Sequence, residues 1–363
     1  MGSMEKLPRY HIYIHPLDIR ELRNDIWCED PVPATLKVNN KKFEIDLNYR
    51  GSHIRKLKKK SYYISFYKPK TFRMANEVHL NAEYNDPSLI RNKLSLDFFS
   101  AIGVLAPQSR YVTLNINGKN EGIYLELESV DENFLLKRNV PKGAIYYAVD
   151  GDANFSLMSD LDKDVKKSLD VGYERKCGTD VDDQYLHEMI MKINTIPKDH
   201  FEKEIPQYMN VNQYLLWLAG VILTQNYDGF VHNYALYRNE NTGQFEVMPW
   251  DYDATWGRDV HGEIMEEDYV PITGFNTLTA RILDVQSFRK QYQKILSRIL
   301  QHQFTIEYLK PKIESLQQLI RPYVLEDPYE KDRIERFDQE QEIILQYIDK
   351  RAEYIKSHLY KLN

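Results

Sequence analysis

The predominant spacing of apolar residues changes near Asp131, and that change limits the possible folds more than any other feature. From Thr35 to Tyr67, apolar side chains recur at every second position, which is typical of β-strands with one buried face. A turn at Asn39-Asn40 and a charged loop interrupt the pattern, so it predicts three strands. Their apolar positions are Leu36 and Val38, then Phe43, Ile45, Leu47 and Tyr49, and finally Tyr62, Ile64 and Phe66.

One helix and two more strands are predicted before the change. Asp86 and Ser88 are typical helix-start residues, the apolar face that follows has helical spacing, and Gly103 can end the helix. We therefore expect a helix over 88–103. Strands from about 111 to 116 and from 123 to 127 are separated by Asn117-Gly118, a strong hairpin signal.

Helical spacing dominates after Asp131, close to the expected lobe boundary. A polar stretch over 150–183 is rich in Asp and Lys and is expected to be a long insertion. The order of elements is the one that protein kinases use, although fold analogy alone does not establish function. Helices are predicted near 184–196, 211–225, 276–302, 306–320 and 333–360, with one hairpin among them.

The predicted fold class is α+β, with a small antiparallel β lobe that carries one helix and a larger, mainly helical lobe. We expect residues 1–10 to be a tail or cloning remnant, 11–130 the β lobe, and 131–363 the helical lobe of a single two-lobed domain. With 363 residues, 42% of them hydrophobic, the chain is long enough for a substantial core.

Composition excludes several classes of protein. Nowhere do eighteen consecutive apolar residues occur, and the first residues lack the apolar stretch of a signal peptide, so we expect neither a membrane partner nor export by that route. Two cysteines without a CxxC pair favour neither a disulfide framework nor a thiolate zinc site. The 54 acidic and 48 basic residues give a net charge of −6, which disfavours a nucleic-acid partner.

Three polar residues around the predicted hairpin form the candidate catalytic site. The helix over 211–225 is apolar on several faces and should be buried, and it ends just before Asp228. The strands near 234–238 and 245–249 place position 233 opposite about position 250, so Asn233 and Asp251 should meet at the open end of the hairpin. Asp228 would act as a base for an attacking hydroxyl.

The same residues suit a metal ion held with ATP. Magnesium prefers oxygen ligands and needs only one or two from the protein beside the phosphates, so Asn233 and Asp251 would suffice. Asp253 would contact a second ion or merely brace a turn. Asp and Asn are also common in ordinary turns, so the spacing alone would be weak. The agreement of spacing, buried helix and hairpin favours catalysis.

The most basic segment of the chain runs from Arg50 to Ser61 and is a candidate phosphate-binding loop. It could instead be a solvated loop or a nucleic-acid patch. Lys60 lies two residues before Tyr62, so the alternation of a strand places it on the same face as Tyr62, Ile64 and Phe66. We expect this apolar face to line the cleft, where the Lys60 ammonium would pair with ATP phosphates. Arg50, beside Gly51, would add a second phosphate contact.

Two aromatic residues are candidates for binding the adenine base. Trp250 precedes Asp251, and Tyr147 lies in the predicted second lobe, from which it could cover the other face of the base. Ordinary core packing is the alternative for Trp250.

Several segments taken together resemble the CotH kinase family of Bacillus spore coat proteins, from Tyr10 onward. The resemblance implies an atypical, secretory-kinase-like fold that uses ATP with Mg²⁺ or Mn²⁺ to phosphorylate serines of basic, Ser-rich coat proteins and so directs coat assembly. It implies that Asp228 is the catalytic aspartate and Asp251 a metal ligand, and that the protein is made in the mother cell and ends in the spore coat. The matching segments are Tyr49-Arg50-Gly51-Ser52, Lys59-Lys60-Ser61-Tyr62, 89–93, 117–122, 228–233 and 249–253.

The chain departs from ordinary protein kinases in three ways. No G-x-G-x-x-G occurs, so the loop over 50–60, including Gly51 and Ser52, would cover the phosphates differently. Asn226-Tyr227 replaces the His-Arg before the base, which predicts constitutive activity. No Glu lies in the helix over 88–103, which leaves Glu83 or Asp97 as the acidic partner of Lys60. An adenylyl transferase and a non-enzymatic scaffold or adhesin remain alternatives.

Overall fold

The computed structural model describes residues 6–68 and 71–363, and internal contacts group the chain into two units. The barrel unit comprises the residues up to Lys93 together with 107–129 and 311–342, and the helical unit comprises 94–106, 130–310 and 343–363. Both units are therefore assembled from separate stretches of the chain. Residues 1–5 of the predicted tail lie outside the described residues, and the first strand begins at Arg9, inside that predicted tail.

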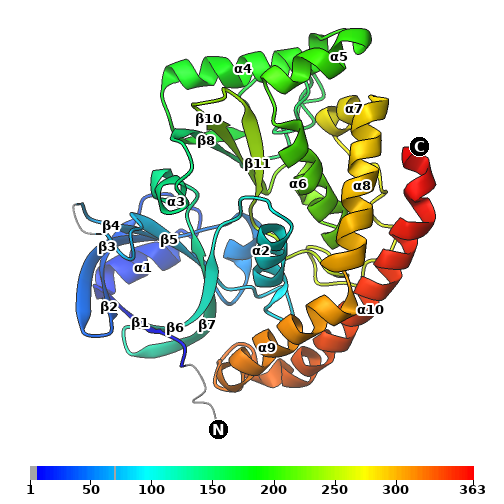
Figure 1. The fold of residues 1–363 in the computed structure, drawn as a ribbon. Helices are drawn as coiled ribbons and strands as arrows, with labels where there is room; N and C mark the ends of the chain where they lie inside the picture. Colours follow the sequence, from blue (N-terminus) through cyan, green and yellow to red (C-terminus); the bar gives the residue numbers. More distant parts are fainter. Residues whose placement is uncertain (1–5, 69–70) are drawn as a thin grey trace. The chain divides into compact units, whose positions relative to one another are not determined.

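The barrel unit is built on a closed barrel of seven strands in the order β1-β2-β3-β4-β5-β7-β6 (Figure 1). Neighbouring strands are antiparallel except for β1 and β6, whose parallel pairing closes the barrel. The α+β class is confirmed, but the expectation of a merely small, antiparallel β lobe is wrong. The strands are β1 (Arg9–Ile14), β2 (Val32–Val38), β3 (Lys41–Tyr49), β4 (Tyr62–Phe66), β5 (Glu77–Asn81), β6 (Ser109–Ile116) and β7 (Lys119–Glu128).

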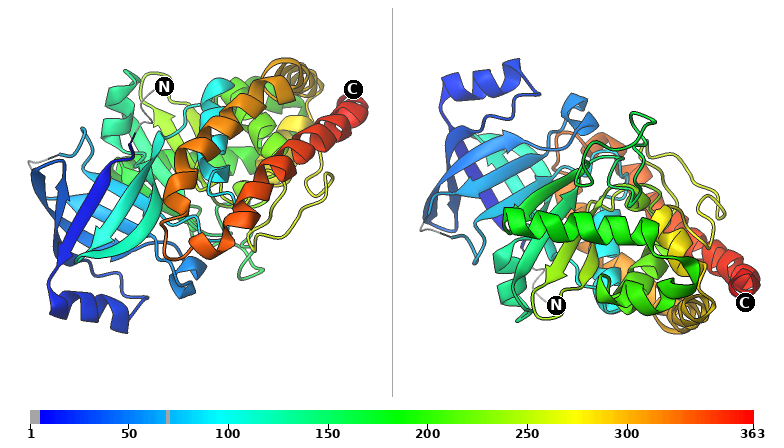
Figure 2. Two further views of the ribbon diagram at one scale, coloured as in Figure 1. Left: turned by 90° about the horizontal axis from the view of Figure 1, so that it is seen from below. Right: turned by 90° about the horizontal axis from the view of Figure 1, so that it is seen from above.

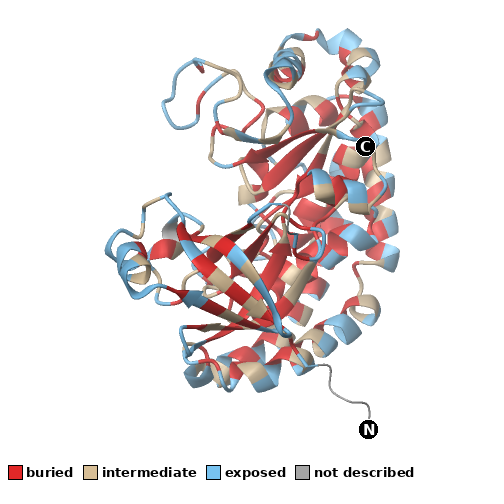
Figure 3. Ribbon diagram, turned by 90° about the vertical axis from the view of Figure 1, so that its left-hand side faces the viewer, coloured by how far each residue is buried: buried red, intermediate tan, exposed pale blue. Residues whose placement is uncertain are grey.

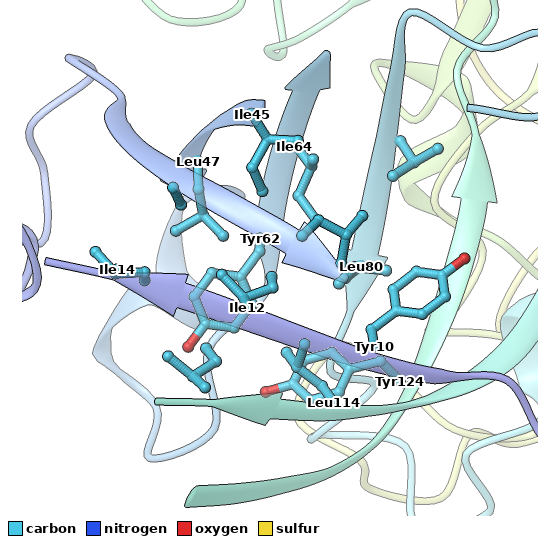
Figure 4. Close-up of a cluster of buried hydrophobic side chains, with 14 of the residues drawn as sticks. Tyr10, Ile12, Ile14, Ile45, Leu47, Tyr62, Ile64, Leu80, Leu114 and Tyr124 are labelled. Carbon is cyan, nitrogen blue, oxygen red and sulfur yellow. The ribbon is translucent and has the colours of Figure 1, made fainter. Parts of the chain in front are cut away.

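The barrel interior is filled by the apolar positions that alternate along the strands (Figure 4). Side chains such as Ile45, Leu47, Ile64 and Leu80 are fully buried there. The predicted turns are also present: Asn39 and Asn40 have φ of 48° and 62°, and Asn117 and Gly118 have φ of 49° and 84°, as tight hairpin turns require. The period-two pattern therefore identified strands and turns correctly where it was visible.

Buried ion pairs fix the segment 311–342 within the barrel unit. Lys59 Nζ lies 2.7 Å from Asp327 Oδ2, and Arg91 Nη1 lies 2.6 Å from Asp86 Oδ1 and 2.8 Å from Glu340 Oε2. All these side chains are fully buried. Because a buried charge is stable only with a well-placed partner, these pairs require the segment to stay packed on the barrel.

The helix predicted over 88–103 is shorter in the structure. It begins at Arg91, as α2 (Arg91–Ala101), because Asp86 forms a turn in which its carboxylate accepts from the Ser88 and Arg91 amides at 2.9 Å each. The barrel unit contains α1 (Pro16–Asn24) and the 3₁₀ turn η1 (His53–Lys56), neither of which was predicted.

The helical unit contains a four-stranded antiparallel sheet with the order β11-β10-β8-β9. The predicted hairpin corresponds to β10 (Tyr234–Asn239) and β11 (Phe245–Pro249), whereas β8 (Gly143–Ala148) and β9 (Tyr173–Cys177) were not predicted. Figure 3 shows that β8, β10 and β11 are largely buried. Helix α4 (Asp180–Thr195) runs across one end of this sheet (Figure 2), and α6 (Val211–Thr224) packs against β11.

The other predicted helices are present, with one division. The helix expected over 276–302 is split into α7 (Thr277–Leu283) and α8 (Gln286–His302), because Val285 adopts an extended conformation with ψ of 120°. The helices predicted near 306–320 and 333–360 correspond to α9 (Ile306–Val324) and α10 (Ile334–His358). Two short helices, α3 (Glu132–Lys137) and α5 (Lys198–Glu204), were not predicted. In the part of the chain that the structure describes, no helix has both the length and the apolar character needed to cross a membrane.

Candidate active site

Helix α6 positions Asp228. Its residues are almost all buried, and the helix ends at Gln225 in the left-handed conformation with φ of 55°. The chain then turns through Asn226, whose side-chain oxygen accepts from the Gly229 amide at 3.1 Å, and forms the 3₁₀ turn η3 (Asp228–Phe230). Asp228 therefore lies in a hydrogen-bonded turn directly after a buried helix.

The backbone around Asp228 is held while its carboxylate stays accessible. The Asp228 carbonyl accepts from the amides of Val231 at 3.0 Å and His232 at 2.8 Å. The Asp228 side chain is 25% exposed, and Oδ2 lies 3.8 Å from His232 Nε2. This combination of a fixed backbone and a reachable carboxylate suits a group that accepts a proton from a substrate.

The register of the hairpin confirms the predicted proximity of positions 233 and 250. Tyr234 pairs with Pro249, and the Trp250 amide donates to the Asn233 carbonyl at 3.1 Å. Asn233 and Asp251 therefore both lie at the open end of the hairpin. Each is in the left-handed region, with φ of 58° and 59°, a conformation that is unusual for residues other than glycine and that clusters at functional sites.

The oxygen ligands at the open end of the hairpin suit a cation that keeps several water ligands, rather than a metal ion that is coordinated by protein side chains alone. Among residues 6–68 and 71–363, no group of three or more His, Cys, Asp or Glu is placed to hold a metal ion. Asn233 and Asp251 offer an amide and a carboxylate oxygen, which is enough for Mg²⁺ or Mn²⁺ when phosphates and waters complete the shell. Asp253 is half-buried, and its carbonyl accepts from Thr255 at 3.2 Å, as expected of a residue that braces a turn.

Tyr147 and Trp250 come together, but they contact each other. Their ring centroids are 4.9 Å apart and the planes are inclined by 26°, a stacked pair. Both rings belong to a buried apolar cluster, and the Tyr147 hydroxyl accepts from the Val130 amide at 2.7 Å. An adenine base could lie between the two rings only if they separated.

A cavity of about 260 Å³, lined in part by Tyr227 and Phe230, the chain neighbours of Asp228, was not predicted from the sequence. We call it the Asp160 cavity, because Asp160 lines it together with Asn154, Tyr227, Phe230 and Phe275. The aromatic residues contact one another, with centroids 5.1 Å apart for Tyr227 and Phe275 and 5.4 Å for Phe230 and Phe275. Part of its wall comes from the 150–183 insertion, so the only sequence signal was the unusual length of that segment.

Tyr269 extends the aromatic cluster towards Asp228. Its ring centroid lies 5.9 Å from that of Tyr227, and it is 49% exposed. Partial burial raises the pKa of Tyr269, and the charges of Asp259 and Asp228 and the neighbouring Tyr227 raise it further. Exposed aromatic rings and carboxylates therefore share the surface around Asp228.

In the barrel unit, Arg50 and Lys60 point to opposite sides of the barrel wall. Arg50 hydrogen-bonds the side chain of Asn81, which follows the interior residue Leu80 and therefore faces outwards. Lys60 lies on the same side as Tyr62, as predicted, but that apolar side is the barrel interior rather than a cleft face. The phosphate contact of Lys60 and the second phosphate contact of Arg50 stay predictions, and the structure places the two side chains on different faces of the barrel wall.

The acidic partner predicted for Lys60 is also not found. Lys60 Nζ donates to the Arg55 carbonyl, whereas Glu83 Oε1 accepts from the side-chain nitrogen Nδ2 of Asn92 at 3.0 Å. Neither Glu83 nor Asp97 forms an ion pair with Lys60 among the described residues.

The buried lysine is instead its neighbour Lys59. Besides the ion pair with Asp327, Lys59 Nζ donates to the Ile123 carbonyl at 2.7 Å. Sequence reasoning missed Lys59 because parity assigned it to the solvent side, where the segment 311–342 covers it.

The start of the basic loop is ordered by Arg55. Arg55 Nε donates to the Gly51 carbonyl at 2.7 Å, and the Arg55 amide donates to the Ser52 carbonyl at 3.2 Å. Gly51 has φ of 82°, and a Cβ there would lie 2.8 Å from the Ile54 side chain, so any other residue would be strained at this position. Gly51 and Ser52 themselves are exposed.

Comparison with known proteins identifies the family. A family model described as CotH kinase protein matches residues 47–355, and the chain belongs to the CotH kinase protein family. Among its relatives, the inner spore coat protein H of Bacillus subtilis (strain 168) is 62% identical over 359 residues, which cover 99% of both chains. The inner spore coat protein H-like protein of the same strain is 32% identical over 304 residues, or 84% of this chain and 87% of that protein.

Two solved structures show a more distant likeness. The Helicobacter pylori proinflammatory kinase CtkA has 12% identity and a TM-score of 0.37, with 98% of this chain and 99% of that chain covered. HipA of Shewanella oneidensis MR-1, solved in a complex with HipB and operator DNA, has 13% identity and a TM-score of 0.38, with 98% and 75% covered. Scores this low carry no conclusion about mechanism.

Proposed function

We propose that this protein is an ATP-dependent protein serine kinase that phosphorylates other spore coat proteins and so directs coat assembly. The observation that carries the proposal is the joint placement of Asp228, at the end of a buried helix, and of Asn233 and Asp251 at the open end of one hairpin. Membership of the CotH kinase protein family and the names of two spore coat relatives agree with it. The protein would be made in the mother cell and reside in the coat.

In the proposed reaction, the serine hydroxyl attacks the γ-phosphorus of ATP while its proton passes to the Asp228 carboxylate. The bond between the γ-phosphorus and the β–γ bridging oxygen breaks, and ADP leaves with the electron pair. Asn233 and Asp251 would hold Mg²⁺ or Mn²⁺, which neutralises phosphate charge when bound. Asp253 is kept as a candidate for bracing the turn or for contacting a second ion.

The predicted nucleotide contacts other than that of Lys60 are kept as part of the proposal, each taken within its own unit. The rings of Trp250 and Tyr147 stack directly on each other in the structure. In the proposal they separate when ATP binds, and the adenine base lies between them. Arg50, with the exposed backbone of Gly51 and Ser52, would contact phosphates from the outer side of the barrel wall. We do not retain Lys60 for this role, because its ammonium lies on the interior side.

The Asp160 cavity suits a basic side chain next to the acceptor serine. Aromatic faces and carboxylates both attract a cationic group, the first through the ring quadrupole and the second through charge. Asp160 and the cluster of Tyr227, Phe230 and Phe275 supply both within the helical unit. We therefore propose that Lys or Arg of a Ser-rich basic coat protein occupies this cavity while Asp228 receives the serine.

Incubation with labelled ATP, Mg²⁺ or Mn²⁺, and a Ser-rich basic peptide tests the proposal directly. We expect phosphate incorporation by the natural protein and its loss in Asp228→Asn and Asp251→Asn, with Asp199→Asn, an exposed residue on α5, as matched control. No incorporation with either metal would overturn the kinase assignment.

Mass spectrometry of the product decides between the alternatives. A mass increase of one phosphate on serine indicates a kinase, whereas an added AMP would identify adenylyl transfer. A peptide left unmodified by a folded, ATP-binding protein would leave the scaffold or adhesin role.

The absence of an arginine before Asp228 bears on regulation. Asn226 and Tyr227 occupy those positions, and the Asn226 side chain instead holds the turn through the Gly229 amide. We propose constitutive activity, so phosphatase treatment of the purified protein should leave its rate unchanged. A large loss of activity after such treatment would contradict this.

A further inference from the structure

A second cavity, of about 230 Å³, lies in the barrel unit and is strongly basic. Four cationic side chains line it: Arg23 from α1, Lys58 and Lys60 from the loop before β4, and Lys119 from β7. We call it the basic barrel cavity. None of the roles proposed above uses it.

The positive charge of this cavity is not neutralised from within. Its single lining carboxylate, Glu121, is already engaged, since Lys119 Nζ lies 3.0 Å away and the Tyr329 hydroxyl donates to it at 2.6 Å. Arg23, Lys58 and Lys60 form no ion pair within 4.0 Å anywhere in residues 6–68 and 71–363. Three positive charges therefore converge on one space without a counter-charge.

Tyrosine side chains add neutral donors to the same space. Tyr49 and Tyr62 line the cavity with ring centroids 5.5 Å apart, and both are more than nine-tenths buried. Behind them, the buried Tyr124 hydroxyl has no hydrogen-bond partner in the described part of the chain. In Figure 4 the hydroxyls of Tyr62 and Tyr124 point to the side on which Ile14 lies, and Ile14 also lines the cavity.

Lys60 is held in an unfavourable environment unless an anion is present. The residue is half-buried, and its ammonium donates to the Arg55 carbonyl and lies 5.9 Å from the centre of the Tyr49 ring. Burial lowers the pKa of Lys60, as expected for an ammonium that loses water without gaining a carboxylate. An anionic ligand in the cavity would replace the missing hydration.

We propose that the basic barrel cavity binds a phosphate monoester, namely a phosphoserine side chain of a peptide, at a site distinct from the nucleotide. A phosphomonoester carries close to two negative charges and three acceptor oxygens, which matches three unpaired cations and the tyrosine hydroxyls. A carboxylate would neutralise only one of the three cations. Phosphoserine binding requires no turnover by this protein, so the inference does not depend on the proposed kinase activity.

The test measures binding by the full chain carrying Asp228→Asn, so that no phosphate transfer can intervene. A fluorescent phosphoserine peptide and its unphosphorylated twin are titrated by anisotropy. We expect the phosphopeptide to bind at least tenfold more tightly, and Lys60→Met to remove most of that difference. Lys56→Gln is the matched control, because Lys56 is an exposed lysine of the same loop that does not line the cavity.

Two further measurements distinguish a phosphopeptide from free phosphate as the ligand and provide a second variant in case Lys60→Met folds poorly. Competition by inorganic phosphate at the same concentration as the phosphopeptide would support the cavity but assign it to free phosphate. Arg23→Gln, on the exposed side of α1, should weaken phosphopeptide binding if the Lys60 variant folds poorly. Equal binding of the two peptides, equal effects of Lys60→Met and Lys56→Gln, or displacement by a non-hydrolysable ATP analogue would each overturn the proposal.

Discussion

The two cavities of this protein have similar sizes and opposite electrostatic character. The basic barrel cavity, about 230 Å³, gathers Arg23, Lys58 and Lys60 around tyrosine rings, whereas the Asp160 cavity, about 260 Å³, combines a carboxylate with tyrosine and phenylalanine rings. Aromatic rings line both cavities, so they do not determine which ligand is attracted. The comparison teaches that the same aromatic lining serves an anion or a cation according to the charges placed around it.

The largest expected effect is that of a change at Asp228 on the rate of peptide phosphorylation. Asp228→Asn removes the proton acceptor, and loss of a general base lowers the rate by roughly 100- to 10,000-fold. Binding of phosphoserine peptide to the barrel should stay unchanged. The measurement is peptide phosphorylation beside anisotropy on the same preparation. Parallel loss of both would mean that the two cavities are not independent.

Two neighbouring lysines test how the barrel uses its positive charges. Lys59→Met leaves Asp327 buried without its partner, which should destabilise the protein by about 3–5 kcal/mol. Lys60→Met removes a half-buried cation that has no carboxylate partner, and its effect should stay within about 1 kcal/mol.

Urea unfolding followed by near-ultraviolet circular dichroism measures both lysine variants. Similar free energies of unfolding for the two would show that Lys59 is not the structural lysine and that Lys60 is not free for a ligand.

The Asp160 cavity can be tested through its charge. Asp160→Asn keeps the shape of the side chain but removes the attraction for a basic residue, so KM for a basic acceptor peptide should rise about tenfold, as for the loss of about 1.4 kcal/mol. Asp162→Asn, exposed in the same insertion and absent from the cavity lining, is the control. A peptide with norleucine in place of lysine should be insensitive to the Asp160 change; equal sensitivity would argue against a cation subsite.

The smallest expected effect is the change with pH in the affinity of the basic barrel cavity for the phosphopeptide. Because burial lowers the pKa of Lys60, its ammonium loses its proton at lower pH than an exposed lysine does, so phosphopeptide binding should weaken as pH rises through that pKa. The phosphate itself titrates near pH 6, so the relevant window lies above neutrality. Lys60→Arg stays charged and should flatten the profile between pH 7 and 10, which anisotropy can follow. A profile unchanged by this substitution would assign the titration to another group.

The sequence predicted what depends on local spacing. Most of the long helices, the Asn117-Gly118 turn and the 233–250 register follow from periods and turn chemistry within short segments. Asn233 and Asp251 could be brought together from the sequence for that reason.

Barrel closure could not be predicted in the same way. Strand β5 carries Glu77, His79 and Asn81 on its outer side, all buried, so it lacks the apolar–polar alternation that marks a half-exposed strand. The alternation of side chains placed Lys60 on the correct face of its strand. It could not show whether that face lines a cleft or the interior of a barrel. The Asp160 cavity required contacts between segments more than a hundred residues apart.

The parallel pairing of β1 and β6 has a consequence for assembly. Since it joins the two ends of the strand order, the barrel exposes no unpaired strand edge on which another chain could add by backbone hydrogen bonding. In a densely packed protein shell, this barrel would resist edge-to-edge association, and neighbours would have to recognise it through side chains and bound ligands.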